Sequence, residues 1–256
     1  AELGLDCVYL CHDVVPSAVA AAVAGARAMG FAGFNVTMPC KAAVIEHLDE
    51  LSPAARLMGA VNTVKREGDR LIGHNTDGAG LLRSVAERGF DVAGADVAVI
   101  GAGGAGSAVY TQAALDGAGR VSVFKRANAS FGPTSQKIAA LSERTGVNLT
   151  LTDVADEAAL ERAVREADIV VDATRVGMAP LESQSNVKEE WLRPGQAVVD
   201  TVYHPRETKL LALAARAGAT PIDGLGMLLW QAAIAEEIWL DVAMPVDRVR
   251  EAVFGG

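Results

Sequence analysis

The stretch D-V-A-V-I-G-A-G-G-A-G at residues 96–106 decides the fold of this chain. An apolar run typical of a buried strand leads into a glycine-rich turn and then into a helical run at residues 107–115. Glycines have no Cβ, so their backbone can approach a pyrophosphate, which the N-terminus of the helix then holds. A second strand at residues 121–124 completes a β-α-β unit. We therefore interpret the turn as nucleotide-binding rather than merely tight.

Strands and helices alternate over residues 97–222, which is the signature of a doubly wound parallel sheet. We predict an α/β fold with two domains. Residues 1–77 plus 225–256 form an α/β substrate domain, to which a C-terminal helix returns, and residues 78–224 form a Rossmann-like dinucleotide-binding domain. In the substrate domain we expect a strand at residues 8–10 and a helix at residues 42–48.

The end of the second strand of the β-α-β unit selects the dinucleotide. An acidic residue there would hold the ribose hydroxyls of NAD. This chain has Lys125 and Arg126 instead, with Asn128 nearby. Two cations suit the extra phosphate of NADP, and the alternative is a solvated basic strand end.

Composition excludes several classes of protein. Half of the 256 residues are apolar, which is enough for a full core, and the net charge of -9 argues against a nucleic-acid or membrane surface. No apolar run of membrane-spanning length and no leader pattern is found, so we expect a cytoplasmic protein. The three cysteines, Cys7, Cys11 and Cys40, neither pair evenly nor complete a metal site, and we expect no metal.

A second group of polar residues lies outside the nucleotide-binding region. In F-N-V-T-M-P-C-K at residues 34–41, the proline ends a strand and Lys41 falls where a helix begins. Asp77 opens another helix, and taken alone it is a cap. Together Lys41 and Asp77 would form an acid/base pair. Asn62 on a buried strand is a satisfied core amide or a ligand group, and Gln231 in a long apolar helix faces water or grips a substrate hydroxyl.

Taken together, these motifs resemble the shikimate dehydrogenase family, in particular its quinate/shikimate dehydrogenase branch. They follow one another in family order over nearly the whole chain. The matching stretches are N-V-T-M-P-C-K at 35–41, G-A-V-N-T at 59–63, N-T-D-G at 75–78, G-A-G-G-A-G at 101–106, V-Y-H-P at 202–205 and D-G-L-G-M-L-L-W-Q at 223–231.

The resemblance implies an enzyme that reversibly reduces 3-dehydroshikimate to shikimate, and 3-dehydroquinate to quinate, by hydride transfer from a nicotinamide. It implies Lys41 and Asp77 as the catalytic pair, a small-molecule substrate, and a monomer or homodimer. Substrate contacts would come from Thr37, Asn62, Tyr203 and Gln231. The dinucleotide would lie along Gly101, Ala102, Gly103, Gly104, Ala105, Lys125, Arg126, Asn128, Arg175, Thr201 and Gly224.

The sequence departs from the family pattern at two places. The family begins with another strand and helix carrying a serine pair that binds the substrate carboxylate, whereas this sequence opens at what resembles the last turn of that helix, A-E-L-G at residues 1–4. Either the sequence lacks its start or the carboxylate site is incomplete, and we favour the first, because a sheet without its leading strand would expose an unpaired edge. K-R-A-N at 125–128 replaces both the Asn-Arg of NADP-using members and the acidic residue of NAD-using ones. The cofactor is therefore NADP or NAD, with NADP favoured. Two alternatives stay open: a dehydrogenase of an aminated shikimate analogue, and a catalytically silent NAD(P)-binding regulator, against which Lys41 and Asp77 count.

Overall fold

The computed structural model describes residues 3–255 of the chain, which divides into two compact units. One unit contains Ala1–Thr76 and Gln231–Gly256, and the other contains Asp77–Trp230. The long helix α8 (Gly224–Leu240) begins in the second unit and ends in the first. That one unit holds substrate and the other a dinucleotide stays a prediction, as do the predicted domain limits.

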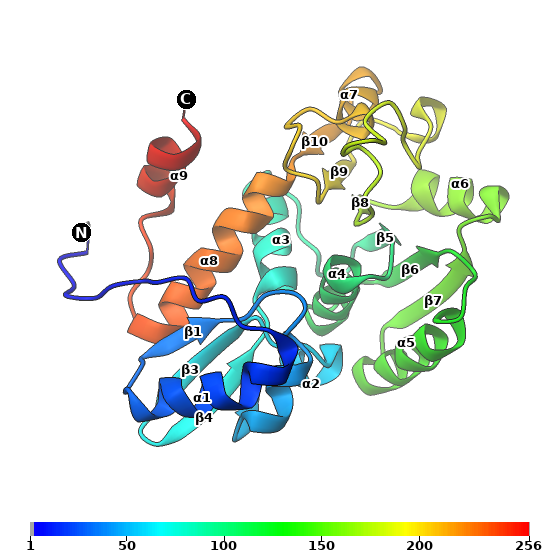
Figure 1. Ribbon diagram of the computed structural model, residues 1–256. Helices are drawn as coiled ribbons and strands as arrows, with labels where there is room; N and C mark the ends of the chain where they lie inside the picture. Colours follow the sequence, from blue (N-terminus) through cyan, green and yellow to red (C-terminus); the bar gives the residue numbers. More distant parts are fainter. Residues whose placement is uncertain (1–2, 256) are drawn as a thin grey trace. The chain divides into compact units, whose positions relative to one another are not determined.

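The second unit is built on a six-stranded parallel sheet in the order β10-β9-β8-β5-β6-β7 (Figure 1). Numbered from β5 along the chain, this is the Rossmann order 3-2-1-4-5-6. The α/β class with a doubly wound parallel sheet, predicted from the alternation of strands and helices, is confirmed. The strands are β5 (Asp96–Ile100), β6 (Arg120–Lys125), β7 (Asn148–Asp153), β8 (Ile169–Asp172), β9 (Ala197–Asp200) and β10 (Thr220–Ile222).

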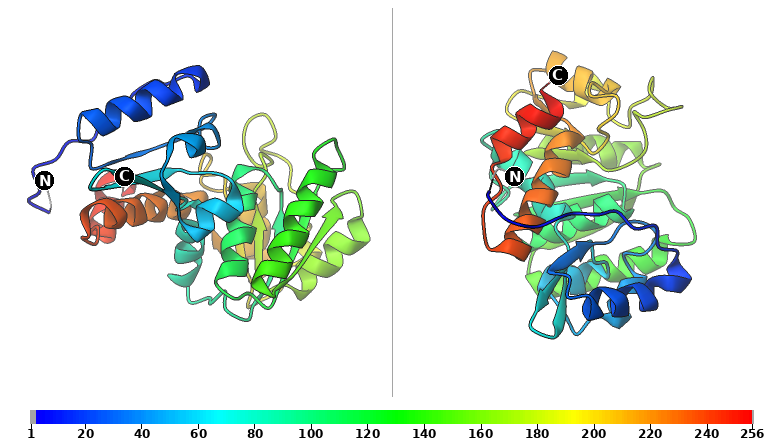
Figure 2. Two further views of the ribbon diagram at one scale, coloured as in Figure 1. Left: turned by 90° about the horizontal axis from the view of Figure 1, so that it is seen from below. Right: turned by 60° about the vertical axis from the view of Figure 1, so that its left-hand side comes forward.

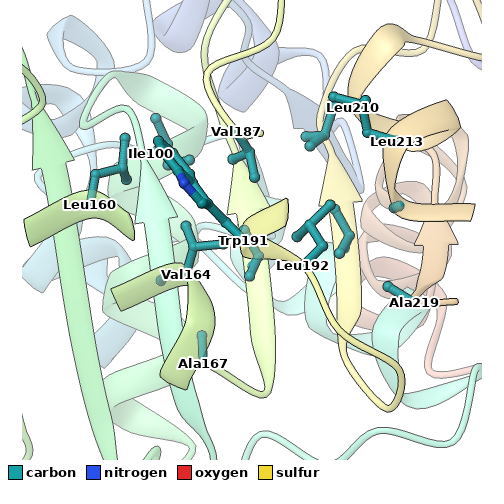
Figure 3. Packing of buried hydrophobic residues seen from close by; sticks show 14 of the residues in the cluster. Ile100, Leu160, Val164, Ala167, Val187, Trp191, Leu192, Leu210, Leu213 and Ala219 are labelled. Atoms are coloured by element: carbon teal, nitrogen blue, oxygen red, sulfur yellow. The ribbon is translucent and has the colours of Figure 1, made fainter. Parts of the chain in front are cut away.

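Helices cover both faces of this sheet, as a doubly wound sheet requires. On one face, Trp191 lies among side chains of α6, α7 and the strands (Figure 3). The strand residues that alternate with this face, such as Val97, Val99 and Val171, are also fully buried. The helices of the unit are α3 (Asp77–Ala86), α4 (Gly104–Leu115), α5 (Phe131–Thr145), α6 (Glu157–Glu166), the short 3-10 helix η3 (Glu189–Trp191) and α7 (Lys209–Arg216).

The first unit contains a four-stranded mixed sheet in the order β1-β3-β4-β2. Antiparallel pairs join β1 to β3 and β3 to β4, while β2 runs parallel to β4. Helix α1 lies along this sheet (Figure 2), with Val19 and Val23 in the core. The elements are η1 (Pro16–Ala18), α1 (Val19–Ala28), β1 (Gly33–Asn35), η2 (Ala43–His47), β2 (Glu50–Leu51), α2 (Pro53–Met58), β3 (Thr63–Glu67), β4 (Arg70–His74) and α9 (Val246–Phe254).

Two sequence predictions for the first unit are wrong. Residues 8–10 form no strand, because no strand among the described residues pairs with them, and Val8 is 86% exposed. Tyr9 instead donates a hydrogen bond to Asn35 Oδ1. The predicted helix over residues 42–48 is only the 3-10 helix η2, whose hydrogen bonds span three residues, such as Leu48 N to Ile45 O. It ends at His47, because Leu48 already has an extended backbone.

None of the helices within residues 3–255 combines the length and the apolar character needed to cross a bilayer.

Candidate functional site

The glycine-rich turn after β5 combines two tightly packed glycines with two open ones. Gly101 has φ +100°, and a Cβ on Gly106 would lie 1.9 Å from Gly101 O. A Cβ on Gly103 or Gly104 would meet nothing within 4 Å. Helix α4 begins at Gly104, and its N-cap Gly103 makes no side-chain capping hydrogen bond. Gly103 and Gly104 are exposed, so α4 begins at an exposed N-terminus without a side-chain cap, which is an arrangement that can hold a phosphate.

This turn lies where doubly wound sheets bind their ligands. The winding of the sheet reverses between β5 and β8, and ligands occupy the crevice at the carboxyl ends of those strands. Gly101 directly follows β5, and Ala173 directly follows β8. The two loops are in contact, because a Cβ on Gly101 would lie 2.8 Å from Ala173 O. Geometry and motif thus select the same place for the dinucleotide.

Basic side chains without acidic partners gather at the same edge of the sheet. Within residues 3–255, Lys125 Nζ donates only to neutral groups, to Asn128 Oδ1 at 2.8 Å and to Ser130 Oγ at 2.6 Å. The exposed side chains of Arg126 and Arg175 have no hydrogen bond or ion pair within residues 3–255. Sequence reasoning missed Ser130, although a polar Asn-x-Ser run just before a helix was a signal for it.

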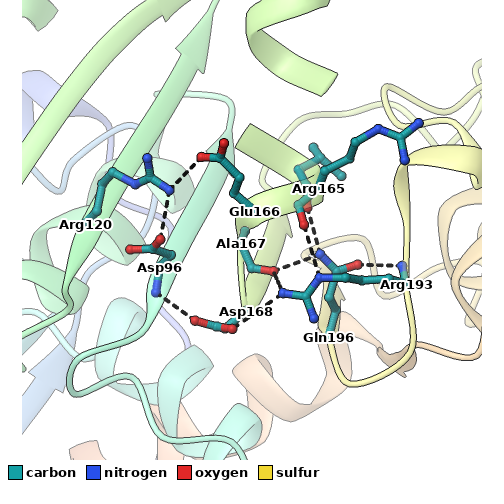
Figure 4. Close-up of polar contacts among 9 residues, drawn as sticks. Asp96, Arg120, Arg165, Glu166, Ala167, Asp168, Arg193 and Gln196 are labelled. Atoms are coloured by element: carbon teal, nitrogen blue, oxygen red, sulfur yellow. Dashed lines mark hydrogen bonds and ion pairs between the residues drawn. The ribbon is translucent and has the colours of Figure 1, made fainter. Parts of the chain in front are cut away.

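The opposite edge of the sheet shows the contrast (Figure 4). Arg120 pairs with Asp96 at 2.8 Å and with Glu166 at 2.9 Å. Arg193 pairs with Asp168 at 3.6 Å and donates to the carbonyl oxygen of Ala167. Arginines at the amino ends of the strands are thus neutralised by the protein itself. Arg126 and Arg175, at the carboxyl ends, have no such partner within residues 3–255 and remain available to an anionic ligand.

Two further residues expected along the dinucleotide lie together beyond β9. A Cβ on Gly224 would lie 2.4 Å from Thr201 O, so the chain requires a glycine there. Thr201 donates through its backbone N and its Oγ1 to Asp172 O, at 3.0 and 3.2 Å. Tyr203 follows in the same loop with 57% of its surface exposed. The second unit therefore brings the predicted dinucleotide residues to one sheet edge.

Sequence reasoning missed two buried carboxyl groups at this edge. Asp172 ends β8 and Asp200 ends β9, opposite each other in register, and both are 1% exposed. Burial raises the pKa of Asp172. Burial, and to a lesser degree the charge of Asp172, raise the pKa of Asp200 to about 6, against hydrogen bonds from Thr208 and Val202 N. The signal was present, since I-V-V-D and A-V-V-D both end an apolar strand in an acid.

In the first unit, hydrogen bonds connect several of the predicted substrate residues. Asn62 Oδ1 accepts from Thr76 N at 2.9 Å, and Asn62 Nδ2 donates to Thr76 Oγ1 at 2.9 Å. Thr76 Oγ1 donates in turn to Gln231 O at 2.9 Å. Val61 N donates to Lys41 O at 2.8 Å, which places Lys41 next to the residue that precedes Asn62. Asn62 lies in the bend just before β3, so the prediction that it sits on a strand is wrong. Lys41, Asn62 and Gln231 thus belong to one neighbourhood.

Two predicted residues occupy the margins of this neighbourhood. Thr37 O accepts from Cys40 N at 2.9 Å, in the turn that leads to Lys41. Asp77 follows Thr76 in the chain and is the first residue of α3, so it belongs to the second unit. The pairing of Lys41 with Asp77 stays a prediction. Within residues 3–255, no cluster of three His, Cys, Asp or Glu side chains is placed to hold a metal ion.

Comparison with known proteins identifies the family. Residues 1–64 match the model of the shikimate dehydrogenase substrate binding domain, and residues 224–254 match that of the shikimate 5'-dehydrogenase C-terminal domain. A relative from Streptococcus uberis, named shikimate dehydrogenase (NADP(+)), is 45% identical; the match covers 99% of this chain and 88% of the relative. The chain belongs to the shikimate dehydrogenase family. It is therefore an NAD(P)-dependent oxidoreductase that acts on a CH–OH group, as the motifs predicted.

Solved structures of a shikimate dehydrogenase and a quinate dehydrogenase share the fold. Shikimate 5-dehydrogenase from Listeria monocytogenes, in complex with shikimate and NAD, is 41% identical with a TM-score of 0.96, over 99% of this chain and 88% of that one. Quinate dehydrogenase from Corynebacterium glutamicum, in complex with NAD, is 31% identical with a TM-score of 0.80, over 93% of this chain and 82% of that one. The shikimate dehydrogenase family recognised from the motifs is thus confirmed by sequence and by structure.

Proposed function

We propose that this chain is a shikimate dehydrogenase that reversibly reduces the ketone of 3-dehydroshikimate, with NADP preferred over NAD. The observation that carries the proposal is the TM-score of 0.96 with the Listeria enzyme, which holds shikimate and NAD, over 99% of this chain. The glycine turn with its open Gly103 and Gly104, and the arginines without acidic partners, fit a phosphate-bearing dinucleotide.

Lys41 is proposed as the proton donor of the reaction. The bound nicotinamide supplies the hydride, and as it reaches the ketone carbon, negative charge grows on the oxygen. A cationic ammonium within hydrogen-bond reach stabilises that oxygen and protonates it, and Asp77 keeps the ammonium oriented. Thr37, Asn62, Tyr203 and Gln231 are proposed to contact the substrate hydroxyls. The turn formed by residues 37–40 fixes the backbone just before Lys41, which supports its role.

Lys41→Ala tests this assignment. We expect kcat to fall by roughly a hundredfold or more, the range of general acid catalysis, with a modest change in shikimate KM. The control is Lys137→Ala, which removes an exposed lysine on α5. Turnover is followed by NAD(P)H absorbance. Unchanged turnover of the Lys41 variant would exclude the role.

Quinate is the second candidate substrate, favoured by the 31% identity with the Corynebacterium quinate dehydrogenase. The same assay run with shikimate and with quinate, each with NADP and with NAD, separates the candidates. We expect absorbance to rise with shikimate and NADP. A rise with quinate alone would reassign the substrate. No rise with any pairing would contradict the proposal and favour the catalytically silent NAD(P)-binding regulator.

A further inference from the structure

The loop that carries Tyr203 is closed at both ends by one buried carboxyl group. Asp200 Oδ1 accepts from Val202 N at 2.9 Å, at the start of the loop. Asp200 Oδ2 bonds to Thr208 Oγ1 at 2.7 Å, at its end. Thr208 is also the N-cap of α7, since its side chain accepts from Leu211 N. We call Asp200, with Val202 N and Thr208 Oγ1, the Asp200 clasp.

The clasp also contacts the loop that follows β8. Gly177 has φ +100°, and a Cβ there would lie 3.2 Å from Thr208 and 3.4 Å from Asp200 Oδ2. That loop carries Arg175 and is folded back by Asp172 in the same manner. Asp172 Oδ1 accepts from Thr174 N at 2.9 Å. Two neighbouring strands thus end in a buried aspartate that shapes the following loop.

This arrangement is costly for the fold. Asp200 is 1% and Thr208 2% exposed, so the carboxyl group loses its hydration, and the Asp172 carboxyl on the next strand adds repulsion when both are charged. A neutral amide would close the same turn without that repulsion. Protein interiors seldom retain two adjacent buried carboxyl groups that lower stability unless another requirement keeps them. We infer that the requirement here is the geometry of the loop that Asp200 closes.

We propose that Asp200 is a positioning residue that acts through Tyr203, by fixing the loop from Thr201 to Thr208 at the carboxyl end of β9. The inference rests on the proposed function, in which Tyr203 contacts the substrate. Tyr203 is 57% exposed, so packing alone does not fix it, and the clasp closes the loop on either side of it. Asp200 itself is too buried to touch substrate.

Kinetics of the full chain test the proposal through Asp200→Ala and Asp200→Asn. Asp200→Ala removes both hydrogen bonds, and we expect shikimate KM to rise about tenfold. Cofactor KM should change less, within about threefold, because Thr201 is held separately by its two hydrogen bonds to Asp172 O. Asp200→Asn keeps the first bond, since its Oδ1 accepts from Val202 N, and replaces the second by one of opposite direction, since its Nδ2 donates to Thr208 Oγ1. The loop stays closed at both ends, so we expect KM within about twofold of the native value. Val164→Ala, a cavity variant on α6, controls for lost stability and should leave both KM values unchanged.

A double-mutant cycle shows whether Asp200 acts through Tyr203. In a Tyr203→Ala background, Asp200→Ala should cost less than about twofold further in kcat/KM, because the side chain that it positions is gone. If the losses in kcat/KM of the two single variants simply add in the double variant, the proposal is overturned. It is also overturned if Asp200→Asn loses as much kcat/KM as Asp200→Ala.

Hydrogen exchange of the loop amides separates failure of this inference from failure of the proposed function. If the native chain turns over no shikimate, the proposed function is wrong, and exchange still tests the clasp. We expect the amides of residues 202–204 and 206–208 to exchange about tenfold faster in Asp200→Ala than in Asp200→Asn or Val164→Ala. Equal exchange in all three variants would overturn the clasp itself.

Discussion

Arg126 follows β6, whose last residue, Lys125, is already engaged. Lys125 is held by Asn128 and Ser130, while the Arg126 side chain has no protein partner in the described part of the chain. A guanidinium can form two parallel hydrogen bonds to a phosphate. This geometry favours a phosphate ligand over the alternative, in which Arg126 is merely a solvated residue at the end of a strand. Arg126 is therefore the residue that we expect to distinguish NADP from NAD.

Replacing Arg126 by alanine should weaken the binding of NADP without affecting the binding of NAD. A charge-assisted hydrogen bond contributes about 1.5–3 kcal/mol, so NADP affinity should fall roughly 10- to 100-fold. NAD lacks the 2′-phosphate and should bind as before. Fluorescence titration with each reduced cofactor measures both, and Arg162→Ala, on the exposed side of α6, is the control. Equal losses for the two cofactors would rule out the assignment.

The carboxyl group of Asp200 should make stability depend on pH. Its pKa is raised from 3.8 to about 6, so the folded state favours the protonated form. The protonated Asp200 carboxyl group stabilises the folded state fully below pH 3.8, and this contribution to the unfolding free energy is lost as the pH rises through about 6. The difference between these pKa values corresponds to about 3 kcal/mol.

Asp200→Asn isolates this effect, because asparagine does not titrate. We expect the unfolding free energy of the native chain, relative to the variant, to fall between pH 4 and 7, and to change little above pH 7. Denaturant unfolding at a series of pH values measures the difference between the two proteins. A difference that stays constant across that range would contradict the raised pKa.

At the scale of elements, the glycine turn divides its glycines between packing and ligand access. A methyl group on Gly106 would overlap Gly101 O, so Gly106→Ala must push α4 away from β5. Overpacking of this kind costs about 1–3 kcal/mol, and we expect a lower melting temperature together with weaker NADPH binding. Gly104→Ala meets no protein atom, so it should keep the melting temperature but weaken NADPH binding. Equal melting temperatures for the two variants would contradict this division.

The elements differ in how far the sequence determines them. Apolar strands alternating with helices over residues 97–222 specify the parallel sheet, because the central strands β5, β8 and β9 are buried on both faces and their apolar pattern is local. Residues 8–10 have the composition of a strand, yet a strand also needs a neighbour, which no local pattern reveals. The residues that follow the strands, such as the glycine turn after β5 and Arg126 after β6, were predictable because they directly follow an apolar run in the sequence. The Asp200 clasp was not, because its hydrogen bond to Thr208 depends on how the loop returns.

At the scale of the whole molecule, the two units differ in continuity. The second unit is one uninterrupted segment, Asp77–Trp230, and supplies its own parallel sheet and the helices on both faces. The first half of α8 packs within it: a Cβ on Gly226 would touch Ser84 of α3, and Arg83 lies over the Trp230 ring at 5.3 Å. The first unit instead joins the beginning of the chain to its end.

This difference predicts that residues 77–230 fold without the rest of the chain. A complete core with no missing strand should unfold cooperatively, and the residues proposed to bind the dinucleotide all lie within the segment. We expect a single thermal transition by circular dichroism, and NADPH affinity within about threefold of the full chain. The same fragment carrying Gly104→Ala should fold but bind weakly, which separates folding from binding. An unfolded native fragment would show that the second unit depends on the first, and a folded fragment without affinity would show that cofactor binding needs residues outside it.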